Sequence, residues 1–202
     1  EIAAFTQPSR QVGGDYYDFF LLPDGCLGIV IADVSGKGLG AALLVSQIQA
    51  ILKAEVRHQR DLAKAVASTN TFVSEITSYE QFATMVYAEY NQATRELTYT
   101  NAGHNQPMLV RPDGTHERLD CGGLVLGVMP QATYEVGCVR LNPGDTILFF
   151  TDGLSDLESP TGADFGEDRA LDLVIKHRAL AADALAREVV REATTFSAGD
   201  LG

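Results

Sequence analysis

Three aspartates stand at the ends of apolar segments, where their carboxylates could bind a metal ion. Asp15 precedes one such segment, Asp33 follows the next, and Asp152 directly follows the apolar residues 146–151. Hard cations such as Mg²⁺ and Mn²⁺ prefer carboxylate, carbonyl and water oxygens as ligands. The sequence therefore predicts a divalent metal site that uses these three acids.

Asp15 and Asp33 flank a predicted β-hairpin. Residues 16–22 are aromatic or apolar except for Asp18, residues 27–32 are apolar, and the Pro-Asp-Gly triplet between the two segments is typical of a tight turn. If the two segments pair evenly across this turn, the numbers of facing residues sum to 48 or 49. Asp15 then lies opposite Asp33 or Val34. Facing like charges destabilise a sheet, so a divalent cation is the natural partner of such a pair.

Each of the three acids also has a purely structural interpretation. Asp15 follows two glycines and could be a turn residue, Asp33 could accept hydrogen bonds at the start of a helix, and Asp152 precedes a glycine as in an Asp-Gly turn. For each acid alone the structural interpretation is favoured. The three acids together favour the metal site.

Other polar segments could contact a phosphate group. The run Ser-Gly-Lys-Gly around Lys37 precedes a predicted helix, but it lacks the GxxxxGK[ST] pattern, so a simple turn into the helix is favoured over a nucleotide loop. Arg10 could bind a phosphate bidentately. His104 lies in a compact polar turn, where it either approaches a substrate or ties off the turn, and the second role is favoured.

The composition excludes several classes of protein. The chain has 202 residues and a formal net charge of -12, which opposes non-specific binding to nucleic acid or to an anionic membrane surface. Cys26, Cys121 and Cys138 lack the spacing of a zinc site or a disulfide framework, which favours a reducing cytoplasm as the location of the protein. We expect Cys121 and Cys138 to be buried in the protein core. No apolar run of membrane-spanning length and no targeting segment is visible.

The chain is expected to fold as an α+β domain of antiparallel sheets covered by helix pairs. Apolar and β-branched segments flank turn signals, which predicts four strand pairs: residues 16–22 with 27–32, 82–90 with 96–101, 107–111 with 116–119, and 134–141 with 146–151. Helical patterns cover residues 38–56, 62–78, 167–177 and 181–193. We expect the first helix to lie in the core, although its apolar surface could instead contact a neighbouring domain or a second copy in a homodimer.

Several motifs in this order resemble the SpoIIE-like branch of the PPM protein phosphatases. They are Val-Gly-Gly-Asp-Tyr-Tyr-Asp from Val12, Ala-Asp-Val-Ser-Gly-Lys-Gly from Ala32 with Ala-Ala-Leu following, Asn-Ala-Gly-His-Asn from Asn101, Gly-Leu-Val-Leu-Gly from Gly123, and Phe-Thr-Asp-Gly-Leu from Phe150. The resemblance covers essentially the whole chain. It implies a four-layer αββα sandwich and a site for two Mn²⁺ or Mg²⁺ ions, with hydrolysis of phosphoserine or phosphothreonine by metal-activated water.

The resemblance also implies roles for particular residues. Asp15, Asp33 and Asp152 match the metal-binding acids of the family, and the backbone carbonyl of Val34 matches a further ligand. Asp18 belongs to the first motif but is not expected to bind metal directly. The family pattern ends in an Asp-Asp pair, whereas the only late acid here is Asp200, so residues 1–202 are expected to be a single phosphatase domain truncated at both ends.

The implied substrate is a phosphoserine on an anti-sigma-factor antagonist in bacterial partner-switching signalling. In this branch a sensory or receiver domain commonly accompanies the catalytic domain in the full-length chain. A phosphatase-like binding module without turnover is the alternative, since the last acidic pair is not seen. A metal-dependent nucleotide hydrolase that uses Lys37 ranks last.

Overall fold

The computed structural model describes residues 1–7, 13–77 and 81–199. These residues divide into two compact units. The larger unit contains the described parts of residues 10–106 and 119–142, and the smaller unit contains those of residues 1–9, 107–118 and 143–202. Each unit has its own hydrophobic core.

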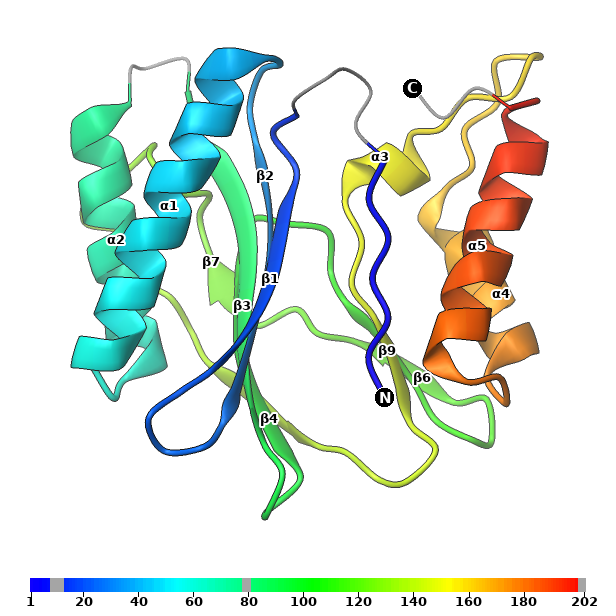
Figure 1. Ribbon diagram of the computed structural model, residues 1–202, viewed down its shortest axis with the longest axis horizontal. Helices are drawn as coiled ribbons and strands as arrows, with labels where there is room; N and C mark the ends of the chain where they lie inside the picture. The colour runs from blue at the N-terminus through cyan, green and yellow to red at the C-terminus, as the bar shows by residue number, and fades with distance from the viewer. Residues whose placement is uncertain (8–12, 78–80, 200–202) are drawn as a thin grey trace. The chain divides into compact units, whose positions relative to one another are not determined.

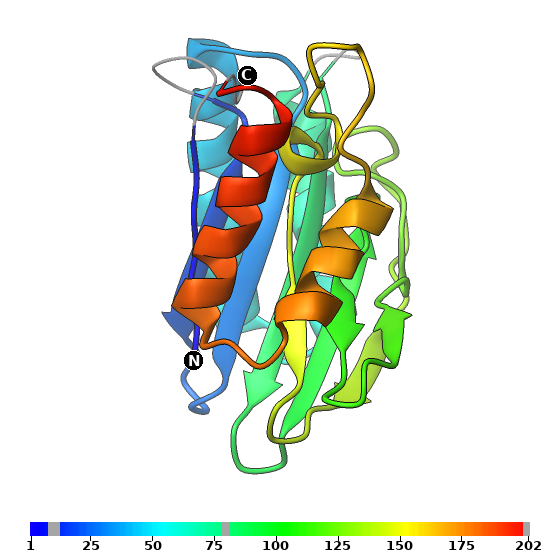
Figure 2. The ribbon, with the colours of Figure 1, turned by 90° about the vertical axis from the view of Figure 1, so that its right-hand side faces the viewer.

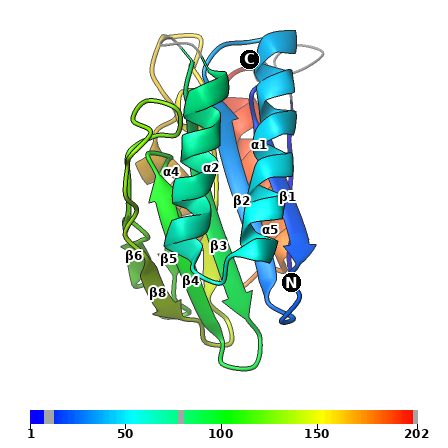
Figure 3. The ribbon, with the colours of Figure 1, turned by 90° about the vertical axis from the view of Figure 1, so that its left-hand side faces the viewer.

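The larger unit contains a mainly antiparallel sheet in the order β1-β2-β3-β4-β7 (Figure 1). Strand β8, labelled in Figure 3, is also paired with β4. Among the strand pairs in the described residues of this sheet, only that of β4 with β7 is parallel. The strands are β1 (Tyr16–Leu21), β2 (Leu27–Val34), β3 (Ala83–Asn91), β4 (Glu96–Ala102), β7 (Gly122–Gly123) and β8 (Gly137–Arg140). Every second residue of β2 is buried, as expected for a strand with one face against a core.

Two helices, α1 (Leu39–His58) and α2 (Leu62–Ile76), lie along one face of this sheet (Figure 3). Apolar residues of α1 recur every three or four positions and are buried in the core of the larger unit: Ala41, Leu44, Ile48, Leu52 and Val56. The predicted core position of this helix is therefore confirmed for one of its faces. Leu39 and Leu43, on other faces, are exposed.

Helix α1 is also the one helix of the described residues whose length and composition would allow it to cross a membrane. An 18-residue window in it reaches a mean hydropathy of 1.3. Core helices of water-soluble proteins can have the same length and composition. One face of α1 is buried in the core of the larger unit. The hydropathy of α1 is therefore weak evidence for a membrane span.

The smaller unit contains a three-stranded sheet in the order β6-β5-β9 and a second helix pair. Its elements are β5 (Met108–Val110), β6 (His116–Arg118), β9 (Thr146–Leu148), the short α3 (Asp152–Ser155), α4 (Glu167–His177) and α5 (Ala182–Phe196). Figure 2 shows α4 and α5 side by side in orange and red. Their apolar residues, such as Val174 and Val189, pack with Met108 and Val110 of β5.

The structure confirms the predicted α+β class and the first three strand pairs. The fourth predicted pair is wrong, because β8 pairs with β4 and β9 pairs with β5. The segment around Pro143 has the composition of a turn, but here it joins two different sheets rather than two paired strands. A turn signal shows where the chain changes direction and does not specify the partner of the next strand. The predicted burial of Cys138 is also wrong, since this residue is exposed.

A partly buried polar cluster around Asp18 fastens β1 to α1. Asp18 accepts hydrogen bonds from the hydroxyl of Tyr16 at 3.0 Å and from the amide of Gln49 at 2.9 Å, and the ammonium group of Lys53 lies 2.5 Å from the same oxygen. Burial alone would raise the pKa of Asp18, but the contacts with Lys53, Gln49 and Tyr16 outweigh it and hold that pKa below its usual value. This Asp18 cluster fixes the strand that begins next to Asp15.

Replacing Asp18 with Asn is expected to lower the free energy of unfolding near pH 7 by about 1 to 2 kcal/mol, because charge-assisted hydrogen bonds are lost. A carboxylate with a depressed folded pKa stabilises the protein above its unfolded pKa of about 3.9 and loses this effect as the pH falls through the folded pKa. Urea unfolding at several pH values should therefore show the wild type and the variant converging in acid. Lys53→Met should reproduce the neutral-pH loss, and a pH-independent difference for Asp18→Asn would contradict the assignment.

Candidate metal centre

The register of β1 and β2 places Asp15 opposite Asp33. Tyr16 pairs with Ala32, so facing residue numbers sum to 48. The pairing continues beyond β1, because the amide of Val34 donates to the carbonyl of Gly14 at 3.2 Å. Asp15 lies between these two pairs and therefore faces Asp33, which confirms the first of the two predicted registers.

Strand alternation separates the polar residues of the first motif onto two faces of the sheet. Tyr16 and Phe20 pack against the core that α1 and α2 cover, and Asp18 contacts α1. Asp15 is an odd number of residues from Asp18 and so projects from the other face. Asp33 projects from that same face, since its neighbours in β2 are buried in the core. This alternation explains why Asp18 braces the strand and is not placed beside Asp33.

Two oxygen atoms of different kinds, one from a main-chain carbonyl and one from a carboxylate, lie close to Gly14. A Cβ atom built at Gly14 would lie 2.4 Å from the carbonyl oxygen of Val34 and 3.0 Å from the Oδ1 atom of Asp33. Only a residue without a side chain allows this approach. A main-chain carbonyl and a carboxylate that converge on one small volume, beside a second carboxylate at Asp15, are the donor types that Mg²⁺ and Mn²⁺ take. The residues of the larger unit therefore fit a hard divalent cation.

Replacing Gly14 with Ala should displace the Val34 carbonyl and weaken Mn²⁺ binding by about 10-fold or more, because backbone atoms cannot move aside as a flexible side chain can. Calorimetric titration with Mn²⁺ measures the effect. Gly13→Ala is the matched control, since its added Cβ would meet nothing closer than 3.9 Å. Equal Mn²⁺ affinity in the two variants would contradict a metal site formed by the oxygen atoms close to Gly14.

Asp152 lies in the smaller unit, at the first position of α3. Its carboxylate is exposed, and its carbonyl accepts a hydrogen bond from the amide of Asp156 at 2.8 Å. We expected residues 146–151 to be one strand ending at Asp152, but β9 ends at Leu148 and the chain enters a helical turn instead. Within neither unit, over its described residues, do three His, Cys, Asp or Glu side chains gather as a metal site. The ligand role of Asp152 stays a prediction.

The polar turn at His104 is closed by the side chain of Asn101, whereas the favoured prediction was that His104 itself would tie off the turn. The Asn101 side chain accepts from the His104 amide at 2.7 Å and donates to the His104 carbonyl at 2.9 Å. The imidazole Nδ1 lies 2.8 Å from the hydroxyl of Thr84, which pairs with Asp33 across β2 and β3. Sequence reasoning missed Thr84. The threonine in the segment that forms β3 was the available signal for a polar residue near the site. The register of β3 with β2 could not be derived, because no short turn joins these two strands.

Two predicted residues, Arg10 and Asp200, lie outside the described part of the chain. Lys37 is exposed in a loop where Gly36 and Gly38 have positive φ angles, and α1 begins at Leu39 with Gly38 as its N-cap. This geometry is that of a turn into a helix, which is the interpretation that the sequence favours. The nucleotide-hydrolase alternative stays a prediction.

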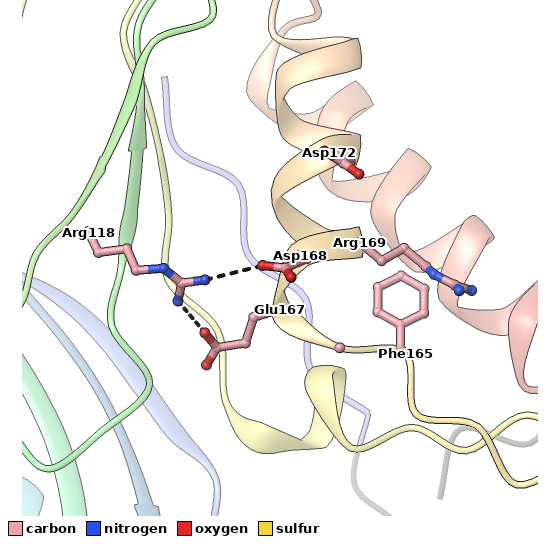
Figure 4. Close-up of a pocket in the computed structure, with 7 residues that line it drawn as sticks. Arg118, Phe165, Glu167, Asp168, Arg169 and Asp172 are labelled. Carbon is pink, nitrogen blue, oxygen red and sulfur yellow. Dashed lines mark hydrogen bonds and ion pairs between the residues drawn. The ribbon is translucent and has the colours of Figure 1, made fainter.

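A hollow of about 630 Å³ in the smaller unit contains none of the predicted metal-binding acids (Figure 4). Arg118 and Arg169 line it together with Glu167, Asp168 and Asp172. Arg118 is paired with Glu167 and lies 3.7 Å from Asp168, while Arg169 lies over the rings of Phe165 and Phe196. Carboxylates thus outnumber the cations around the hollow, which makes it a poor site for a phosphate group.

Comparison with known proteins assigns the fold. The PP2C domain of SiaA from Pseudomonas aeruginosa superposes with a TM-score of 0.84 at 22% identity, covering 94% of this chain and 76% of that one. A structure of the RsbU and RsbW domains of a Mycobacterium tuberculosis protein gives a TM-score of 0.79 at 27% identity, covering 97% of this chain and 54% of that one. The chain therefore has the fold of the PP2C-type, or PPM, phosphatases, which confirms the predicted fold class.

The family model for stage II sporulation protein E matches residues 23–202. The phosphoserine phosphatase RsbU of Bacillus subtilis is 32% identical, over 80% of this chain and 48% of its own length. This chain belongs to the SpoIIE family of PPM phosphatases. It spans less than half the length of the curated relatives that it matches.

Proposed function

We propose that the chain is the catalytic domain of a metal-dependent protein serine/threonine phosphatase, with both units contributing to one domain over residues 1–202. The observation that carries this proposal is the convergence of the Val34 carbonyl and the Asp33 carboxylate at Gly14, with Asp15 in the facing position. Membership of the SpoIIE family and the PP2C-type fold support it.

The proposed ligands are Asp15, Asp33, the carbonyl of Val34 and Asp152. Two ions of Mn²⁺ or Mg²⁺ are proposed, and RsbX, a structural neighbour with a TM-score of 0.66 at 20% identity, was solved in complex with magnesium. When bound, such ions lower the pKa of a water molecule and offset the charge that develops on the phosphate.

The protein's own contribution is to hold these oxygen atoms in place. The side chain of Val34 is buried in the core and its amide donates to the carbonyl of Gly14, so this residue is held by both packing and strand pairing. Asp15 and Asp33 are held in facing positions by the β1–β2 ladder, which the Asp18 cluster fastens to α1. Preorganised ligands do not have to be rearranged when the metal and substrate bind.

The proposed substrate is a phosphoserine on an anti-sigma-factor antagonist in the bacterial cytoplasm. The similarity to RsbU, whose name describes a phosphoserine phosphatase, supports this choice. A sensory or receiver domain in the full-length chain is the proposed regulator. Since the curated relatives are more than twice as long as the matched region, they have room for such a domain.

Asp15→Asn and Asp152→Asn should each lower Mn²⁺-dependent phosphate release from a phosphoserine protein by roughly 100-fold or more, because each removes a charged metal ligand. Asp24→Asn is the matched control. Asp24 lies at the opposite end of the same hairpin, is exposed and pairs with Arg60, so its loss should leave turnover unchanged.

Full activity in either ligand variant would contradict the assignment of that residue. Binding of the antagonist by a wild type that binds no Mn²⁺ and shows no turnover would instead support the phosphatase-like binding module. Activity should be measured over a range of Mn²⁺ concentrations, so that weakened metal binding is distinguished from a slower chemical step.

A further inference from the structure

Thr84 and His104 extend the line of polar residues that begins at Asp15 and Asp33. Asp33 pairs with Thr84 across β2 and β3, so their side chains share one face of the sheet. The hydroxyl of Thr84 lies 3.4 Å from the carbonyl oxygen of Asp33 and 2.8 Å from Nδ1 of His104. A single hydroxyl thus connects an imidazole to the peptide group that joins Asp33 to Val34.

The backbone of His104, which carries this imidazole, is held by the side chain of Asn101. His104 and Asn101 are both buried, and the Asn101 side chain bonds the amide and the carbonyl of His104. Gly103 between them has a φ angle of +68°, and a Cβ atom there would lie 2.4 Å from Val125. Position 103 therefore requires glycine, and the turn has little freedom to move the imidazole of His104.

We propose that Thr84 and His104 are positioning residues for the metal site, an inference that rests on the proposed function. With the Thr84 hydrogen directed to the Asp33 carbonyl, Nδ1 of His104 carries a proton and donates it to the Thr84 oxygen. The hydroxyl then resists rotation of the Asp33–Val34 peptide. This peptide links the Asp33 carboxylate to the Val34 carbonyl, the two oxygen donors that converge at Gly14.

A purely structural role for the Thr84–His104 contact predicts a different outcome. Loss of a buried hydrogen bond lowers stability wherever it occurs, but only a bond that positions ligands also changes metal affinity. Thr100 provides the comparison, because it is fully buried in the same unit and its hydroxyl donates to the carbonyl of Glu135 at 2.7 Å. This bond involves neither Asp33 nor Val34.

The test compares Thr84→Val, Thr84→Ser and Thr100→Val by calorimetric titration with Mn²⁺ in the absence of substrate. Thr84→Val keeps the shape of the side chain without its hydroxyl and should weaken Mn²⁺ binding by about 10-fold, the effect typical of groups that orient metal ligands. Thr84→Ser restores the hydroxyl and should bind within about 3-fold of the wild type, on the scale of a modest hydrogen-bond change. Thr100→Val should lose stability while keeping its Mn²⁺ affinity.

His104 is tested by a conservative pair. His104→Asn places an amide group near the position of Nδ1 and should retain most of the Mn²⁺ affinity, whereas His104→Leu should resemble Thr84→Val. Nitrogen NMR of the wild-type imidazole should show the tautomer protonated at Nδ1. The opposite tautomer would overturn the proposed direction of the hydrogen bonds and with it the inference.

The inference and the proposed function fail in different ways. If the wild type binds Mn²⁺ and releases phosphate while Thr84→Val binds Mn²⁺ equally well, the positioning role is overturned and the phosphatase assignment stands. If the wild type neither binds Mn²⁺ nor releases phosphate, the proposed function is overturned and the positioning role falls with it.

Discussion

The antiparallel pairing of β1 with β2 is the interaction on which the candidate site depends. Its register places Asp15 opposite Asp33 and brings Gly14 against Val34. A shift by one residue would move each of these side chains to the other face of the sheet. Two facing carboxylates repel each other, and a bound cation would offset this repulsion. The apolar face of the same hairpin, packed under α1, stabilises the register independently of any metal.

Both faces of the hairpin are therefore used. On one face, Asp18 bonds Tyr16, Gln49 and Lys53 and fixes β1 to α1. On the other, the line of polar residues continues from Asp33 to Thr84. Because successive residues alternate between faces, a short motif provides both a metal-binding acid and the acid that braces its strand.

The sequence was sufficient where the information was local. The first hairpin and the four longer helices followed from turn residues and apolar periodicity, and counting narrowed the partner of Asp15 to Asp33 or Val34. The partners of β8 and β9 could not be derived in this way, because strand pairing between distant segments depends on the whole sheet. Thr84 was missed for the same reason, since its contact with Asp33 spans 51 residues. The helical turn at Asp152 was hidden by the apolar residues that precede it.

The most direct test of the metal site is anomalous diffraction from crystals of the protein grown with Mn²⁺. The proposed site predicts an anomalous peak within coordination distance of the Val34 carbonyl and of the carboxylates of Asp15 and Asp33. Manganese bound only at other residues, or no anomalous peak at these oxygen atoms at saturating Mn²⁺, would contradict it.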